Sequence, residues 1–264
     1  MRQSLPKKLL KPLILAAYRA RGHYPARIHG VPFRVNPDHL AFWRSVSHGR
    51  WENETFAILD RFLKPDLDFI DIGAWIGPLT LYAAGRSRRV LAVEPDFHAY
   101  RCLLENLGLN RLRNVVTFQA ALGARTEIRR MTVMEGQPGN SLTRLTDLGS
   151  GGDTFEVPGF SWTDWARLAN PGKVSLLKID IEGGEFELLP AMMEYLSARK
   201  PPLLVSLHLP FLPRDTHEKC LVEFRGVLDL YRNRLDENMQ PIQPDALFER
   251  MRREVTNVLL VGAI

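Results

Sequence analysis

Short apolar runs alternate with stretches of helical spacing along most of the chain. Apolar runs bounded by Gly, Pro or acidic residues predict strands at 67–72, 90–93, 115–118, 174–181, 203–207 and 257–262. Apolar residues at helical spacing predict helices at 55–63, 77–84, 97–109 and 216–230, with another ending near 192. This alternation indicates a doubly wound α/β fold with a mostly parallel sheet, in which ligands bind beyond the carboxyl ends of the strands.

Residues 1–55 depart from this pattern and are expected to form a small extension in front of an α/β domain at 56–264. Helical spacing covers 4–20, and residues 27–43 are expected to form a β-hairpin. The first 30 residues hold seven Lys and Arg and no acid. They are interpreted either as a solvated helix packed on the domain or as a basic segment that meets a membrane surface or another anionic partner.

A second departure lies at 128–160. Strands are expected at 131–134 and 155–157, and the stretch between them, 136–152, is rich in Gly, Ser and Thr. We interpret it as a hairpin-like insertion whose loop covers a substrate or simply connects two strands.

The composition, 45% hydrophobic and 25% charged, is ordinary for a globular protein. No run approaches the roughly 18 apolar residues of a membrane span, and the apolar run at 13–17 is shorter than the about 7–15 residues of a signal peptide. A cytoplasmic protein is therefore expected. Cys102 and Cys220 lack the spacing of a zinc site or a disulfide framework.

The first candidate site is the segment DIGAWIG at 71–77, where a strand runs through a turn into a helix. Gly73 would permit a tight turn close to a ligand, and Gly77 would let the helix pack against the sheet. Glu94 ends the next strand about 20 residues after Asp71, where an acid can bind a ribose. A nucleoside cofactor is expected, although a glycine turn without a ligand would look similar.

Dinucleotides require a second glycine at the position of Trp75, because the helix N-terminus must approach a pyrophosphate. S-adenosylmethionine (SAM) has no phosphate, and an acid at the end of the strand suits its ammonium and sulfonium groups. SAM is therefore favoured over a nicotinamide cofactor. The expected cofactor-binding residues are Asp71, Gly73, Ala74, Gly77, Glu94, Ala120 and Ala121. The last two, after the third strand, would leave room for adenine or would simply pack well.

The candidate catalytic residues follow the fourth and fifth strands of the domain. Strand alternation would place Lys178, Asp180 and Glu182 on one face. Such burial of ionisable groups is costly unless they are paired or functional, so Lys178 and Asp180 could also form a structural ion pair. His208 falls at the same sheet edge, either as a core histidine or as a group that takes a proton near neutral pH. Asp180, Glu182 and His208 are the predicted catalytic residues.

The chain resembles the FkbM family of SAM-dependent methyltransferases. The resemblance covers about residues 50–210 and rests on DFIDIGAWIGPLTLYAA, VLAVEPDFHAYRCLLENLGLN, QAALG and LLKIDIEGGEFELL, in that order. It implies a seven-stranded Rossmann-like class I methyltransferase fold and O-methylation of hydroxyls on sugars, macrolides or related natural products. It also implies that Asp71, Gly73 and Gly77 line the methionine part of SAM, that Glu94 binds the ribose, and that Asp180 and Glu182 lie near the transferred methyl.

Family members often have Asn where this chain has Trp75, which leaves the contacts at this position open. Residues 50–54, RWENE, are similar to a family segment before the first core helix and are a candidate lid over the cofactor.

The expected reaction needs a base for the acceptor hydroxyl, with His208 as the first choice and Asp180 or Glu182 orienting it or replacing it. A divalent cation held by the two carboxylates is compatible with the sequence but not required by it.

The expected partner is a small-molecule or glycan acceptor, with no nucleic acid, and the oligomeric state is left open. The alternatives are a protein or nucleic-acid methyltransferase and a cofactor-binding scaffold without turnover. Against a nucleic-acid enzyme, the fourth strand lacks an Asn/Asp-Pro-Pro-Tyr segment, and neither cysteine follows a proline.

Overall fold

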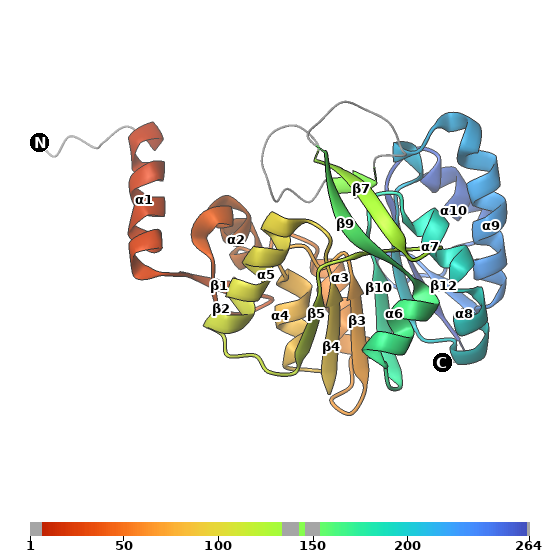
Figure 1. Cartoon of the computed structure of the whole chain (residues 1–264), viewed down its shortest axis with the longest axis horizontal. Helices are drawn as coiled ribbons and strands as arrows, with labels where there is room; N and C mark the ends of the chain where they lie inside the picture. The colour runs from red at the N-terminus through yellow and green to blue at the C-terminus, as the bar shows by residue number, and fades with distance from the viewer. Residues whose placement is uncertain (1–6, 134–142, 146–153, 263–264) are drawn as a thin grey trace, which may run out of the picture.

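The computed structural model describes residues 7–133, 143–145 and 154–262. A seven-stranded sheet forms its centre, in the order β12-β13-β11-β10-β3-β4-β5 (Figure 1). β13 runs antiparallel to both of its neighbours, and the other pairs of adjacent strands are parallel. The strands are β3 (Asp68–Ile72), β4 (Arg89–Val93), β5 (Val115–Phe118), β10 (Val174–Ile179), β11 (Leu203–Leu207), β12 (Asn233–Leu235) and β13 (Thr256–Val261). The predicted doubly wound α/β fold with a seven-stranded, mostly parallel sheet is confirmed.

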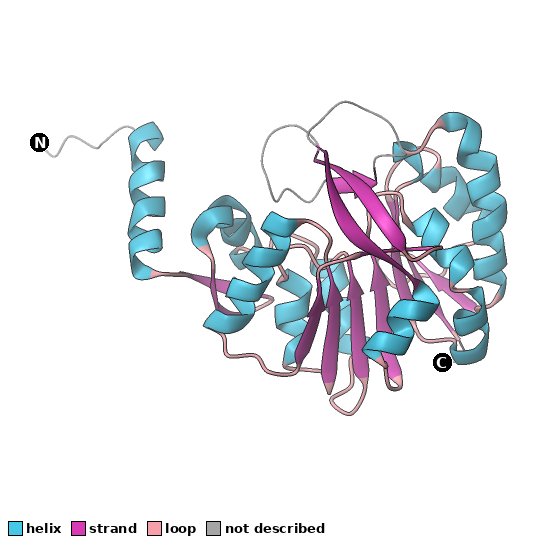
Figure 2. Ribbon diagram, in the orientation of Figure 1, coloured by secondary structure: helices cyan, strands magenta, loops and turns pink. Residues whose placement is uncertain are grey.

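The central strands are buried along their whole length because both faces of the sheet are covered by helices (Figure 2). Every residue of β3 and β10 is buried. Alternate side chains enter two separate cores, so that Ile70 and Leu177 pack on one face while Phe69 and Leu176 pack on the other. This double burial fixes the register in which the strand ends meet.

The helices of the domain are α3 (Asn53–Phe62), α4 (Pro78–Ala84), α5 (Phe97–Leu109), α6 (Trp162–Ala169), α7 (Glu185–Ala191), α8 (Met193–Arg199), α9 (His217–Asp229) and α10 (Pro244–Met251). The sequence patterns did not reveal α6, α8, α10 and the short β12. α6 nevertheless carries an apolar stripe, since Trp162, Trp165 and Ala169 are buried. Its eight residues are too few for the periodicity to stand out.

The N-terminal extension contains α1 (Lys7–Arg21), β1 (Tyr24–Ile28), β2 (Val31–Val35), a 3-10 turn (Pro37–His39) and α2 (Leu40–Ser47). The hairpin therefore spans 24–35, and its prediction at 27–43 is wrong in its bounds. Residues after 36 turn helical because the Asn36 side chain accepts the Asp38 N–H and Pro37 takes the first position of the turn. The hairpin and α2 bury Ala26, Val35 and Trp43 in the same core as one face of the sheet.

α1 stands away from the rest of the molecule (Figure 1) and is tied to it by an ion pair between Arg19 and Asp38, 2.8 Å apart. Within the described ranges, no helix is long and apolar enough to cross a bilayer. The suggested contact of this basic segment with a membrane surface stays a prediction, because the side chains of residues 7–11 lie outside those described.

The predicted insertion forms a four-stranded sheet in the order β6-β9-β7-β8, built from β6 (Ala121–Gly123), β7 (Glu127–Val133), β8 (Thr143–Leu145) and β9 (Thr154–Ser161). The hairpin-like pairing of β7 with β9 runs from Glu127 opposite Gly159 to Thr132 opposite Thr154. Arg129 joins this sheet to α7 through an ion pair with Glu187 of 2.6 Å. Most of the loop expected at 136–152 lies outside the described residues.

Candidate active site

The turn after β3 brings three elements together. Its backbone is left-handed at Gly73, Trp75 and Gly77, with φ of 81°, 50° and 89°. A Cβ at Gly73 would lie 1.8 Å from the Asp180 carbonyl oxygen, and one at Gly77 would lie 2.5 Å from Leu103 on α5. The glycines therefore let the chain after β10 and helix α5 pack on the turn. For Gly77 the packing partner is α5 rather than the sheet, which corrects the expectation.

Glu94 links the ends of β3 and β4. Its Oε2 accepts the Trp75 N–H and its Oε1 accepts the Asp96 N–H, each at 2.8 Å. Burial raises the pKa of this carboxyl to about 7. Each carboxylate oxygen can accept a second hydrogen bond, which leaves capacity for a ribose hydroxyl.

Two neighbouring cavities open at this edge of the sheet. The first is lined by Glu94, Ala120, Ala121 and Met131 among others. The second is lined by turn residues, by the end of β10 and by the N-terminal extension. Both cavities share Gly73, Asp180 and Glu182 as walls. The structure thus brings together the predicted cofactor and catalytic residues, except Gly77, which lines neither cavity.

Lys178 is a buried cation in the wall of the second cavity. Its Nζ donates to the Gly73 carbonyl oxygen at 2.8 Å and lies 3.5 Å from Asp71 and 3.4 Å from Asp180. Burial by itself would lower the pKa of Lys178, but the two carboxylates raise it above its usual value. Asp71 is fully buried, and its Oδ2 accepts the Thr80 hydroxyl at 2.6 Å. The ion pair between Lys178 and Asp180 that the sequence suggested is therefore present, and Asp71 is a second acidic partner of Lys178.

The loop after β10 owes its shape to Glu185, a residue that the sequence patterns did not single out. Its two oxygens accept the N–H groups of Ile181 at 2.7 Å and Gly183 at 2.9 Å. β10 ends at Ile179, and Glu182 is left-handed with φ of 55°, so strand alternation does not extend through Glu182. The expected clustering of Asp180 and Glu182 is correct, but the loop produces it. Two glycines followed by an acid are the only sequence signal for this arrangement.

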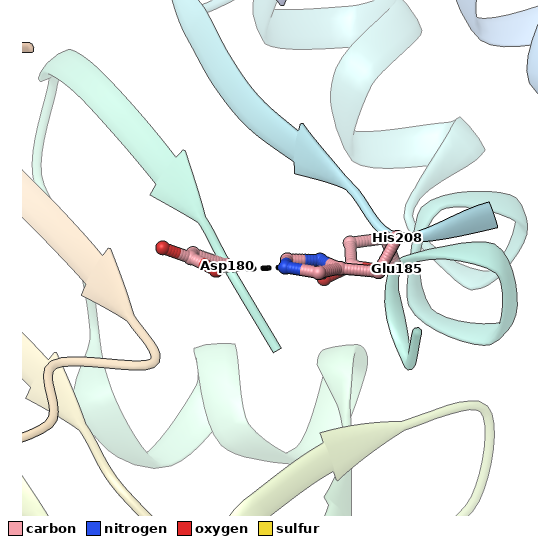
Figure 3. A group of neighbouring side chains, drawn as sticks. All are labelled: Asp180, Glu185 and His208. Carbon is pink, nitrogen blue, oxygen red and sulfur yellow. Dashed lines mark hydrogen bonds and ion pairs between the residues drawn. The ribbon is translucent and has the colours of Figure 1, made fainter. Parts of the chain in front are cut away.

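His208 points into the same loop from the end of β11 (Figure 3). Its Nδ1 lies 3.0 Å from Glu185 Oε1, and its Nε2 lies 3.6 Å from Glu182 and 3.7 Å from Asp180. Burial alone would lower its pKa, but the three carboxylates together raise it to about 9. At neutral pH the ring is therefore an imidazolium, which cannot accept a proton. Burial raises the pKa of Glu182 to about 7, which makes it the better acceptor.

A pH titration of stability would test this charge state. With its folded pKa raised, His208 stabilises the fold fully below about pH 6.5, and this contribution disappears as pH rises through about 9. The gap in unfolding free energy between wild type and His208→Gln should therefore narrow by about 3 kcal/mol between these limits. Chemical denaturation at several pH values measures it. A gap that is constant with pH would contradict the imidazolium assignment.

The atoms of Asp180, Glu185 and His208 lie within 4.8 Å of one another and resemble a cation-binding group. Glu185 already accepts two backbone N–H groups and contacts the His208 ring. A cation at this point would compete with these bonds, which hold the loop. The cluster is explained more simply as a hydrogen-bonded unit that positions Glu182 and Asp180.

The structure also gives Trp75 a role. Its ring packs against Phe42 and His39, with centroids 4.5 and 5.6 Å apart, and Phe42 packs on Trp51 at 5.0 Å. These contacts fasten the N-terminal extension to the turn after β3. The extension thereby places Glu52 in the wall of the second cavity.

The Methyltransferase FkbM domain model matches residues 71–251. Similar solved structures include a methyltransferase FkbM from Methylobacillus flagellatus, at 19% identity over 75% of this chain and 44% of that chain, with a TM-score of 0.44. An rRNA methylase from Streptococcus thermophilus is 12% identical over 79% of this chain and 95% of that chain, with a TM-score of 0.44. No curated protein matches the sequence. Because the family model spans more than half of its length, the chain belongs to the FkbM methyltransferase family.

Proposed function

We propose that the protein is a SAM-dependent O-methyltransferase that acts on a hydroxyl of a sugar, glycan or related small molecule. One observation carries this proposal: the two cavities meet at Gly73, Asp180 and Glu182. A nucleoside held in the first cavity would have its reactive end beside carboxylates in the second. This is the layout that methyl transfer to a hydroxyl requires.

The residues present fit SAM. Glu94 would accept the ribose hydroxyls, and Ala120, Ala121 and Met131 would face the adenine. Among the described residues, Asp71 Oδ1 accepts no hydrogen bond and has only the ion pair with Lys178 Nζ at 3.5 Å. The described wall of the second cavity holds more carboxylates than cations, and this excess of negative charge suits a cofactor with a sulfonium and an ammonium group. The carboxylates are those of Glu52, Asp71, Asp180 and Glu182, against Lys178 and His208.

When bound, SAM supplies an activated methyl whose bond to sulfur breaks as its bond to the acceptor oxygen forms. The acceptor proton must go to a base, and we assign this role to Glu182. His208, the choice from the sequence, would have to be neutral, and its carboxylate neighbours disfavour that form. His208 instead positions Glu182 from 3.6 Å away.

The second cavity also supports a hydroxylated acceptor. Phe42, Trp51 and Trp75 line it together with the carboxylates. Aromatic rings pack on the apolar faces of sugars, and carboxylates accept hydrogen bonds from hydroxyls. The same negative charge would repel the phosphates of a nucleic acid.

Calorimetry with S-adenosylhomocysteine (SAH), followed by transfer of labelled methyl from SAM to a panel of glycans and hydroxylated small molecules, tests the function. Failure to bind SAH would contradict it. Binding without transfer to any acceptor would favour a scaffold, and transfer to RNA or protein would favour the other methyltransferase classes.

A Glu94→Gln variant should bind SAH about tenfold more weakly, because a charge-assisted hydrogen bond to the ribose becomes neutral. Binding of 5′-methylthioadenosine, which has the same ribose but no amino-acid part, should weaken equally. Calorimetry measures both, and Glu194→Gln, an exposed change on α8 outside both cavities, is the control. Unchanged affinities in Glu94→Gln would remove Glu94 from the ribose site.

A further inference from the structure

Glu52 occupies a strained position that its role in α3 does not explain. It precedes α3 with a left-handed φ of 43°, which is unfavourable for a residue with a side chain. Its side chain caps none of the backbone N–H groups of the helix, although it hydrogen-bonds to the Thr55 side chain. Trp51, the residue before it, packs against Phe42 and Phe56, with centroids 5.0 and 5.9 Å apart. The aromatic contacts therefore hold Glu52 in a conformation that its own backbone disfavours.

The surroundings of Glu52 are acidic. Burial and the neighbouring Asp180 raise its pKa to about 7, with Lys178 acting in the opposite direction. Lys178 already donates a hydrogen bond to the Gly73 carbonyl oxygen and forms ion pairs with Asp71 and Asp180, so its charge is shared among these groups. An ionised Glu52 beside these acids is therefore electrostatically unfavourable unless a further positive charge is present. A cationic ligand beside Glu52 would reverse that balance.

Glu52 and Glu182 both line the second cavity and share two charged neighbours, Asp180 and Lys178. Their other partners differ. Glu182 also interacts with His208, which follows β11, and with Glu185 at the start of α7. Glu52 also interacts with Thr55 and with Asp71, the acid of β3 two residues before Gly73. Because Gly73 is a wall of both cavities, a ligand that extends from Glu94 past Gly73 enters the cavity whose wall contains Glu52.

We propose that Glu52 binds the α-ammonium group of the methionine part of SAM, an inference that rests on the proposed function. The amino-acid part of SAM extends from the ribose through the sulfur and ends in this cation. A carboxylate and an ammonium form a charge-assisted hydrogen bond. Through Trp51 and the contact between Phe42 and Trp75, the N-terminal extension thus completes the cofactor site.

The test compares two ligands that differ in the ammonium group. SAH carries the amino-acid part, whereas 5′-methylthioadenosine keeps the nucleoside and the sulfur but lacks it. Calorimetry with Glu52→Gln should show SAH binding weakened about tenfold and 5′-methylthioadenosine binding unchanged. Glu194→Gln, an exposed change on α8 outside both cavities, should leave both affinities unchanged.

The outcomes separate this inference from the proposed function. If wild type binds neither ligand, the proposed function fails. If wild type binds both and Glu52→Gln keeps its SAH affinity, or loses affinity for both ligands equally, the ammonium contact is wrong while the function stands. Thermal unfolding of the ligand-free variant should show no loss of stability, because the substitution removes one of several crowded carboxylates.

Discussion

Replacement of Gly73 by alanine is expected to lower the unfolding free energy by about 3 kcal/mol or more, or to prevent folding. The left-handed backbone costs a residue with a Cβ about 1–2 kcal/mol. The new methyl would also lie 1.8 Å from the Asp180 carbonyl oxygen. That carbonyl belongs to a residue whose N–H donates to Ile72 at 3.0 Å, so the clash cannot be relieved without loss of strand pairing.

Denaturant titration of Gly73→Ala beside Gly85→Ala measures the effect. Gly85 ends α4 with a φ of −80°, and a Cβ added to it would meet no heavy atom within 4 Å. Alanine at Gly85 should therefore be close to neutral. Equal stability of the two variants would show that the turn and the chain after β10 do not pack closely in solution.

Glu182→Gln should reduce kcat by about 100-fold or more, because the amide cannot take the hydroxyl proton. SAH affinity should change little, since the variant keeps the size of the side chain. Glu194→Gln, an exposed change on α8, is the matched control. Retention of full turnover would exclude Glu182 as the base.

The pH dependence of kcat/KM provides an independent check. With Glu182 as the base, activity should rise as pH increases through about 7, because only the ionised carboxylate accepts a proton. With His208 as the base, the rise would come at about pH 9. The position of the rise thus distinguishes the two residues.

The central α/β fold could be predicted from the sequence because buried parallel strands appear in it as nearly continuous apolar runs. The strands at 115–118 and 203–207 agree with β5 and β11 residue for residue. The hairpin bounds were wrong because alternation in a short segment cannot be told from an apolar stripe on a short helix. α6 and α10, of eight residues each, were missed for the same reason.

The turn after β3, Glu94 and the acidic segment after β10 could be located from the sequence itself. Their chemistry depends on local order: a strand, a turn with glycines and an acid at the end of the next strand. Only the tertiary structure decided which of these groups lie within hydrogen-bonding or ion-pairing distance of one another. Glu185, the acid after the two glycines, was not singled out from the sequence, yet it holds the loop and raises the pKa of His208. Trp75 was unexplained because its partner, Phe42, is brought to it by the folded extension. Protonation and long-range packing depend on distances between segments far apart in the chain, and the order of residues alone does not contain those distances.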